Sequence, residues 1–382
     1  MTEHEAYIAF NMVPDFGSVK LAALVAKCGS AAAAWDGFQA KEDWQGKPVD
    51  WQSEIARAVK MHVTIVTCAD ELYPAQLNDL PSKPLALYVV GNPDSMSVPG
   101  VAVVGTRMPT LYGADMAERF SAGIAKGGFS VISGLATGID AEAHKGALAA
   151  GGVTIGVLGG ALDKFFPDEN RELGRRMAAS GGAVVSEYPF GFPPGRKTFP
   201  QRNRIVAALS RAVLAVEAPI QSGTLITCEF ARQLGRKVLV IPANLDSRHS
   251  AGCWKLIREG ATMVTSVKDV LESVKSGPSA KGEPQTKAKG AAKQAGAKGS
   301  PEPAREKGAA RPGKARPETA AKPEMTLEEA AVLRMIPSTG ITLDRLAFVS
   351  KLPADAVGKA TMSLRLKGLL RFLPGNRVAP AK

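Results

Sequence analysis

From about residue 100 to residue 270 the sequence repeats one pattern: a short apolar run, a turn rich in Gly and Ser, and an amphipathic stretch with helical spacing. Apolar runs that alternate with helices are typical of buried parallel strands, because crossover helices cover both faces of a parallel sheet. The pattern therefore predicts an α/β fold with an extended Rossmann-like, doubly wound parallel sheet. Its six strands are expected at Val101–Gly105, Phe129–Ser133, Val153–Gly159, Ala183–Glu187, Ala212–Glu217 and Lys237–Pro242.

The chain has 382 residues, which is long for one domain and suits two or three. Residues 73–274 are assigned to the Rossmann-like domain. Residues 1–72 carry helical patterns on both sides of Val13–Gly17 and predict a small helical unit of the helix-hairpin-helix or SAM-like type. A loop with one glycine is weak evidence for a phosphate site, so we interpret this unit as plain helical packing.

Residues 275–324 are rich in Lys, Ala, Gly and Pro and lack apolar periodicity, which predicts a disordered basic linker. The linker is interpreted as a solvated tether, and an auxiliary phosphate-binding arm is the alternative. Gly308–Lys314 fits the G-x-x-x-x-G-K pattern of a P-loop. Ala315 replaces the Ser or Thr that would hold magnesium, and no strand precedes the segment, so it is not interpreted as one.

Residues 325–382 predict three helices followed by a hairpin whose turn is Pro374–Asn376, the pattern of a winged helix. The third helix carries Lys359, Arg365 and Lys367, a modest charge for a helix that enters a DNA groove. DNA contact and protein contact both remain open for this domain.

The N-terminus lacks a basic segment followed by an apolar core, and no apolar run approaches the roughly 18 residues that span a bilayer. We therefore expect a cytoplasmic protein without membrane contact. The four cysteines form no C-x-x-C pair, and the four histidines have no metal-ligand spacing. No metal and no cofactor is expected.

The net charge of +12 is confined to the C-terminal third of the sequence. Residues 275–324 hold 12 Lys/Arg and 5 Asp/Glu, a net of +7, and residues 325–382 hold 9 and 4, a net of +5. Residues 1–274 hold 27 of each and are neutral. Any anion site in the main body must therefore be a local cluster.

Such a cluster occurs in residues 193–211, PPGRKTFPQRNRIVAALSR, because no acidic residue occurs between Glu187 and Glu217. Phe199 lies among the charges, and an aromatic ring beside basic side chains can stack an unpaired base. A core role for Phe199 is at least as well supported. The basic residues of the segment are Arg196, Lys197, Arg202, Arg204 and Arg211.

Ligands of an open parallel sheet bind beyond the carboxyl ends of the strands, where the strand order reverses. Three glycine-containing turns follow strands at that edge: Gly105-Thr106-Arg107, Ser133–Asp140, and Gln221-Ser222-Gly223-Thr224. Glycine lets the backbone approach a ligand, and the N–H groups of the next helix attract anions, so the expected ligand carries phosphates. No turn spells G-x-G-x-x-G, which argues against a nicotinamide dehydrogenase.

Candidate catalytic groups are few. Asp140 and His144 share a helical face, but Asp140 is more simply a cap or hydrogen-bond partner, and no nucleophile is paired with the histidine. Glu187 and Glu217 end strands and could orient arginines as readily as transfer protons. We expect binding rather than turnover and assign no catalytic residue.

Seven motifs occur in order between Tyr73 and Val274: VAVVGTR, SGLATGIDAEAH, GGALDKFFPDEN, SEYPFG, FPQRNRIVAALS, VEAPIQSGTLIT and LIREGA. With their spacing they closely resemble the DNA processing protein A family (DprA, also called Smf). The resemblance implies a Rossmann-like domain that binds single-stranded DNA, dimerises and loads the RecA recombinase during natural transformation of competent cells.

Carried over residue by residue, the family's phosphate-binding turn falls on Gly105, Thr106 and Arg107. Its basic strip falls on Arg196, Lys197, Phe199, Arg202, Asn203 and Arg204, and the turn at Ser222, Gly223 and Thr224 completes the expected DNA site. Replacing Arg107 or Arg204 by Ala is expected to weaken binding of every sequence alike.

The sequence departs from the family pattern at two places. Pro242-Ala243 stands where the family usually has Pro-Gly, and Gly252-Cys253-Trp254 lacks the usual asparagine before Leu-Ile. Trp254 fits a core residue, a dimer contact or a stacking platform.

Two other functions are weighed against the mediator. Nucleoside-monophosphate phosphoribohydrolases of the lysine-decarboxylase-like group resemble this Rossmann variant, but Glu229 follows Gly223-Thr224 two residues too late for their catalytic turn. A transcription regulator led by the winged helix would leave the basic cluster of the main domain unexplained.

Overall fold

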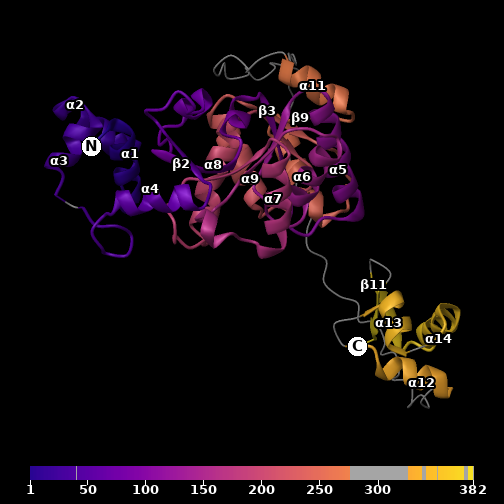
Figure 1. Cartoon of the computed structure of the whole chain (residues 1–382). Coiled ribbons are helices and arrows are strands. Elements are labelled where there is room, and N and C mark those ends of the chain that lie inside the picture. Colours follow the sequence, from indigo (N-terminus) through magenta and orange to yellow (C-terminus); the bar gives the residue numbers. More distant parts are fainter. Residues whose placement is uncertain (40, 276–325, 338–340, 351, 374–376, 382) are drawn as a thin grey trace, which may run out of the picture. The chain divides into compact units, whose positions relative to one another are not determined.

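The structure is a computed structural model that describes residues 1–275 and 326–382, apart from residues 40, 338–340, 351, 374–376 and 382. The described residues form two compact units, one on each side of segment 276–325, and each unit is considered by itself. In the first unit, helices flank a nine-stranded sheet (Figure 1). The linker expected at residues 275–324 lies outside the described residues except for Lys275.

The sheet has the strand order β1-β2-β6-β5-β4-β3-β7-β8-β9. The strands from β3 onward pair in parallel, whereas β1 and β2 join one edge antiparallel. The bounds are β1 Thr64–Thr67, β2 Ala86–Gly91, β3 Gly100–Val104, β4 Ser130–Ser133, β5 Thr154–Val157, β6 Ala183–Ser186, β7 Ser210–Ala215, β8 Lys237–Val240 and β9 Thr262–Met263. All six expected strands are confirmed, and β1, β2 and β9 were not expected.

Strand β3 is the point where the strand order reverses. It pairs in parallel with β4 on one side, where Val101 faces Val131, and with β7 on the other, where Val101 faces Ala212. The chain builds outward from β3 through β6 and then returns to add β7, β8 and β9 on the opposite side. The carboxyl ends of β3 and β7 therefore form the switch point at which doubly wound sheets bind ligands.

Helices connect the strands of the first unit. The α-helices are α1 Glu3–Met12, α2 Ser18–Cys28, α3 Ala31–Gly37, α4 Trp51–Lys60, α5 Leu111–Lys126, α6 Ile139–Ala149, α7 Arg171–Ala179, α8 Thr198–Leu209, α9 Gly223–Gln233, α10 Ala251–Arg258 and α11 Val267–Lys275. Short 3-10 turns lie at Ala75–Asp79, Pro93–Ser97, Leu162–Lys164, Asp168–Asn170 and Arg248–Ser250.

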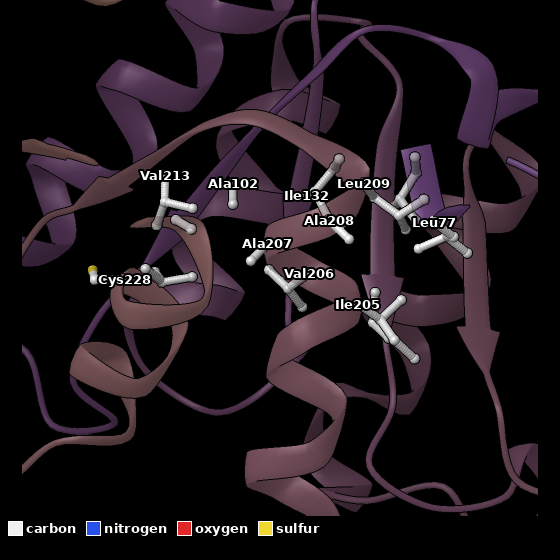
Figure 2. Packing of buried hydrophobic residues seen from close by; sticks show 14 of the residues in the cluster. Leu77, Ala102, Ile132, Ile205, Val206, Ala207, Ala208, Leu209, Val213 and Cys228 are labelled. Atoms are coloured by element: carbon white, nitrogen blue, oxygen red, sulfur yellow. The ribbon is translucent and has the colours of Figure 1, made fainter. Parts of the chain in front are cut away.

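Alternate residues of β3 face the two layers of helices, as a strand buried on both faces requires. Val101 and Val103 pack in a cluster with α5, α6 and α11. Ala102 and Val104 pack in a second cluster with α8 and α9. The C-terminal half of α8, residues 205–209, is entirely buried in that second cluster (Figure 2). This packing anchors α8 and fixes the position of its N-terminal half at the switch point.

The N-terminal helices have a core of their own, in which the ring of Phe10 lies 4.8 Å from Phe16 and 4.9 Å from Trp35, centroid to centroid. The same helices also pack against the sheet, because Ile8 shares a buried cluster with Tyr88 of β2. The sheet itself starts with β1 at Thr64, before residue 73.

The second unit has three helices and a small antiparallel sheet of order β10-β12-β11 around a core that includes Leu346, Leu364 and Val378. The turn expected at Pro374–Asn376 lies outside the described residues. No helix in the described part of the chain is long and apolar enough to cross a membrane. The bounds are α12 Leu327–Arg334, β10 Ile341–Thr342, α13 Leu343–Ser350, α14 Ala354–Leu366, β11 Leu370–Leu373 and β12 Arg377–Pro380.

Candidate nucleic-acid interface

A hollow of about 310 Å³ opens at the carboxyl ends of β3 and β7, and we call it the crevice. Three turns and the start of α8 form its walls, as expected for the switch point of this sheet. Nine of the twelve residues predicted as the DNA site line it: Gly105, Thr106, Arg107, Phe199, Arg202, Asn203, Ser222, Gly223 and Thr224. Arg196, Lys197 and Arg204 do not.

The turn after β3 is held tightly by its neighbours. The Thr106 amide donates a hydrogen bond to the Glu217 carbonyl at 2.7 Å, and the Ile139 amide donates to the Thr106 carbonyl at 3.1 Å. Gly138 has a φ of +81°, and a Cβ there would lie 2.5 Å from the Thr106 oxygen. Only glycine suits both conditions, so the two turns can approach closely enough to fix the backbone that carries Arg107.

Arg107 projects from this turn as an exposed side chain. Its guanidinium carbon lies 5.2 Å from the centroid of the Phe199 ring, a cation–π contact. No described residue forms a hydrogen bond or ion pair with the guanidinium. All its N–H donors therefore remain available to an anion such as a phosphate.

The start of α9 forms the opposite wall of the crevice. Ser222 caps the helix, and its hydroxyl oxygen accepts a hydrogen bond from the Thr224 amide at 3.1 Å. The Asn203 side-chain amide donates to the Gly223 carbonyl at 3.2 Å and ties α8 to this turn. The positive end of the helix dipole thus faces the hollow that Arg107 borders, which makes this wall favourable for an anion.

Arg196 and Lys197 lie immediately before α8. Both side chains are exposed, and neither forms a hydrogen bond or ion pair within the described part of the chain. They adjoin Thr198 and Phe199, of which Phe199 lines the crevice. Their charge therefore adds to the positive potential beside the crevice without forming its wall.

Arg202 lines the crevice only at its floor, where the side chain is almost completely buried. The residue is 5% exposed, and its guanidinium donates hydrogen bonds to the carbonyls of Gly134 and Val157. Burial lowers the pKa of Arg202 to about 10, although the nearby Asp140 carboxylate opposes that shift. These hydrogen bonds hold the floor of the crevice in shape, and the contact of Arg202 with DNA stays a prediction.

Arg204 does not line the crevice. Its guanidinium forms an ion pair with Glu187, and the two side chains are only 17% and 12% exposed. Burial raises the pKa of Glu187, and the charge of Arg204 opposes that shift. Both residues line a different hollow, between the N-terminal helices and the sheet. The geometry thus gives Arg204 a structural partner where the sequence predicted a DNA contact.

The candidate acid and base groups all have structural partners. Asp140 accepts hydrogen bonds from the amides of Gly134 at 3.2 Å and Ala136 at 3.4 Å, in keeping with its expected role. Burial raises the pKa of Asp140, an effect that Arg202 opposes. Glu217 accepts from the Thr110 amide at 2.9 Å and hydroxyl at 2.6 Å.

His144 is fully buried, and its Nδ1 lies 2.7 Å from the Thr154 hydroxyl oxygen. Burial, assisted by the charge of Arg202, lowers the pKa of His144 to about 3, so this imidazole is neutral at pH 7. Among the described residues, no group of three or more His, Cys, Asp or Glu side chains is placed to hold a metal ion. Of these carboxylates, Asp140 lines the crevice, and its hydrogen bonds to backbone amides are structural.

Residues outside the predicted site also define its surroundings. Phe166 is 47% exposed, and its ring centroid lies 5.8 Å from that of Phe199. In the sequence, the two adjacent phenylalanines before Pro167 are the feature that could have drawn attention to Phe166. Glu229 and Trp254 are absent from the described lining of the crevice, and Glu229 borders a hollow between α9 and α10 instead. That position argues against Glu229 as a hydrolase acid at this site.

The comparisons with known proteins agree with this architecture. A family model described as DNA recombination-mediator protein A matches residues 64–275, more than half of the chain. The chain belongs to the DNA recombination-mediator protein A family. Its Rossmann-like sheet and its crevice both lie within the matched residues, and the predicted resemblance to DprA and Smf proteins is confirmed.

Two relatives illustrate the extent of the match. Protein Smf from Synechocystis sp. is 44% identical over 213 residues, which are 55% of this chain and 53% of the relative. The match therefore spans about half the length of that relative. DNA processing protein DprA from Streptococcus pneumoniae is 44% identical over 202 residues, which are 53% of this chain and 71% of the relative.

Two solved structures of the family have the same fold. DNA processing protein A from S. pneumoniae superposes with a TM-score of 0.59 at 33% identity and covers 71% of this chain and 98% of its own. DNA processing protein A from Helicobacter pylori, whose single-stranded DNA binding mode has been described, superposes with a TM-score of 0.51 at 29% identity. That match covers 56% of this chain and 97% of the H. pylori chain.

Proposed function

We propose that this protein binds single-stranded DNA in the crevice and acts as a recombination mediator that protects incoming single strands and loads RecA onto them in natural transformation. The observation that carries the proposal is Arg107, an exposed guanidinium without a hydrogen-bonded partner among the described residues. It lies beside a glycine turn and opposite a helix N-terminus. The single-stranded DNA binding described for the H. pylori family member supports the same ligand.

Each wall of the crevice has a proposed part in holding the strand. Arg107 binds a phosphate through its guanidinium, and Gly105 and Thr106 allow the sugar-phosphate backbone to approach the sheet. The turn of Ser222, Gly223 and Thr224 directs the N-terminus of α9 at a phosphate.

The start of α8 supplies the remaining contacts. Arg196 and Lys197 attract the strand over a longer range, and Asn203 borders the strand from α8. Phe199 supports the Arg107 guanidinium through the cation–π contact. Arg202 acts from beneath by holding the carbonyls of the crevice floor in place.

We propose that the protein works by binding and releases no chemically altered product. The acidic groups near the crevice, Asp140 and Glu217, already accept hydrogen bonds from the backbone. A general acid or base must lie within hydrogen-bond distance of the proton that it transfers to or from the ligand. These contacts favour a binding role over the phosphoribohydrolase alternative.

The domain organisation supports a wider proposal. We propose a helical unit of helix-hairpin-helix or SAM-like type at residues 1–72, the DNA-binding domain at 73–274, a linker at 275–324 and a winged helix at 325–382. We also propose that the protein acts as a homodimer in the cytoplasm and that RecA is its protein partner. The three helices and antiparallel sheet of the second unit agree with a winged helix.

Fluorescence anisotropy with end-labelled oligonucleotides tests the function. The full chain is expected to bind an unpaired thymidylate strand more tightly than a duplex of equal length, with little preference for base sequence. Tighter binding of one duplex sequence would contradict the proposal and support a transcription regulator. Release of a free base from a nucleoside monophosphate would contradict it in favour of the hydrolase.

A further inference from the structure

A hollow of about 380 Å³ lies at the amino ends of β3 and β7, and we call it the amino-edge hollow. The crevice lies at the carboxyl ends of the same two strands, so the sheet separates the two hollows. At about 3.3 Å per residue, β3 spans about 13 Å between them, and one phosphate cannot reach both. The residues that line the amino-edge hollow include Gln76, Ser97, Gly100, Ser210, Arg211 and Arg236.

Arg211 belongs to the predicted basic cluster but lies at this other edge of the sheet. Helix α8 begins beside the crevice and runs back to the amino edge, where β7 begins at Ser210. Gly100 of β3 pairs with Ser210, but the next residue of β3 pairs with Ala212. Arg211 is therefore the extra residue of a bulge, and a bulge redirects the side chain that it carries. The side chain is exposed, whereas the rest of β7 is buried.

The two arginines of the hollow have unused donors. Arg211 forms no hydrogen bond or ion pair with any described residue. Arg236 is 13% exposed, and its Nη2 donates to the Asp79 carboxylate at 2.6 Å. The Nε of Arg236 has no hydrogen-bond partner within the described part of the chain. Since a guanidinium has several N–H donors and Asp79 accepts from one of them, Arg236 is held in place with donors to spare.

The other side chains of the hollow also suit an anion. Gln76 adds an amide and Ser97 a hydroxyl, and none of the described residues that line the hollow is acidic. Both lie on 3-10 turns that are anchored in the core, because Leu77 and Met96 are buried in the same cluster as Leu209 at the end of α8 (Figure 2). Donors held in place by buried neighbours lose little freedom when a ligand binds.

We propose that the amino-edge hollow binds a phosphate of the single strand through Arg211 and Arg236, as a second contact separate from the crevice. The inference rests on the proposed binding of single-stranded DNA. A strand carries a phosphate at every nucleotide, so a long strand held in the crevice brings further phosphates to the opposite edge at a high local concentration. The second contact therefore raises the affinity only for strands that are long enough to reach both hollows.

The test measures fluorescence anisotropy of the full chain with thymidylate strands of about six and about thirty nucleotides. Arg211→Ala is expected to bind the long strand about three- to tenfold more weakly than the wild type, because one phosphate contact is lost. The salt slope for the long strand is expected to become shallower by about 0.7. The short strand fills the crevice alone, so both proteins are expected to bind it equally.

Two further variants control for charge and for structural damage. Arg211→Lys keeps the charge and is expected to keep the salt slope of the wild type. Arg119→Ala removes an exposed arginine of α5 that lines neither hollow, and it is expected to leave both affinities unchanged.

Equal losses on both strands, or no loss on the long strand, would overturn the second contact. An unchanged long-strand affinity together with thermal stabilisation of the wild type, but not of Arg211→Ala, by inorganic phosphate would assign the hollow to a free anion and overturn it as well. The proposed function fails separately, if Arg107→Ala binds the short strand as tightly as the wild type does.

Discussion

Positively charged side chains occur both at the rim of the crevice and on the buried side of α8, but their contacts differ. At the rim, Arg107, Arg196 and Lys197 are exposed and form no ion pair within the described residues. Within α8, Arg202 binds backbone carbonyls and Arg204 binds Glu187. A dense run of basic residues in a sequence can therefore combine side chains that are free to bind a ligand with side chains that stabilise the fold.

The largest expected effect is a loss of stability on replacing Arg204 of α8. Arg204→Met leaves the buried Glu187 carboxylate without its partner, so the free energy of unfolding is expected to fall by about 3–5 kcal/mol in urea titrations. The double variant Arg204→Met/Glu187→Gln removes both charges and is expected to recover much of the loss. If Arg204→Met is as stable as the wild type, Arg204 does not stabilise the fold through Glu187.

The pH dependence of stability tests the buried region independently. The folded pKa of His144 is about 3 against an ordinary 6.5, so between these values the unfolded chain binds a proton that the folded chain does not. Stability is therefore expected to decline as pH falls from 6.5 toward 3, by up to about 1.4 kcal/mol per pH unit from this group.

His144→Gln supplies the comparison for that measurement, because the amide can still donate to Thr154 but does not titrate in this range. Urea titrations at a series of pH values are expected to give a shallower decline for the variant than for the wild type. Parallel declines would mean that His144 is protonated in the folded protein.

At the rim, the expected effect is on binding. Arg107→Ala is expected to weaken the binding of single-stranded DNA by about tenfold to a hundredfold, the loss of charge-assisted hydrogen bonds to a phosphate. Thermal unfolding is expected to stay within a few degrees of the wild type, because the side chain is exposed. A large loss of stability without a loss of affinity would mean that Arg107 stabilises the fold and does not bind DNA.

The smallest effects are expected for the two exposed residues before α8. Arg196→Ala and Lys197→Ala are each expected to weaken binding about two- to fivefold, because solvent screens exposed charges. Anisotropy titrations at low salt resolve such changes best. Lys126→Ala, on the last turn of α5, removes an equal charge outside the lining of the crevice and serves as the matched control.

Much of this architecture could be predicted from the sequence. The period of apolar runs gave six parallel strands, and the glycine turns after β3 and β7 placed the crevice at the switch point. These signals are local, because strand patterning and turn chemistry depend on residues a few positions apart. Strands β1 and β2 were missed because an antiparallel edge does not follow the βα repeat.

The sequence indicated that Glu187 could orient an arginine, but it did not show which arginine, and the carbonyl partners of Arg202 could not be predicted. The carbonyl that Arg202 binds at Gly134 lies 68 positions away in the sequence, and the Glu187 partner of Arg204 lies 17 positions away. Such contacts depend on how the sheet brings β4, β6 and α8 together, which no local pattern encodes. For the same reason the sequence left a stacking role and a core role open for Phe199 and did not reveal its contacts with Arg107 and Phe166.

The dependence of single-strand affinity on salt concentration shows which arginines contact phosphates. The logarithm of the association constant is expected to fall with the logarithm of salt concentration at about −0.7 for each phosphate contacted. Arg107→Ala is expected to make that slope shallower by about 0.7, whereas Arg204→Met keeps the wild-type slope. An unchanged slope for Arg107→Ala, or a shallower one for Arg204→Met, would contradict the assignment of phosphate binding to the rim of the crevice.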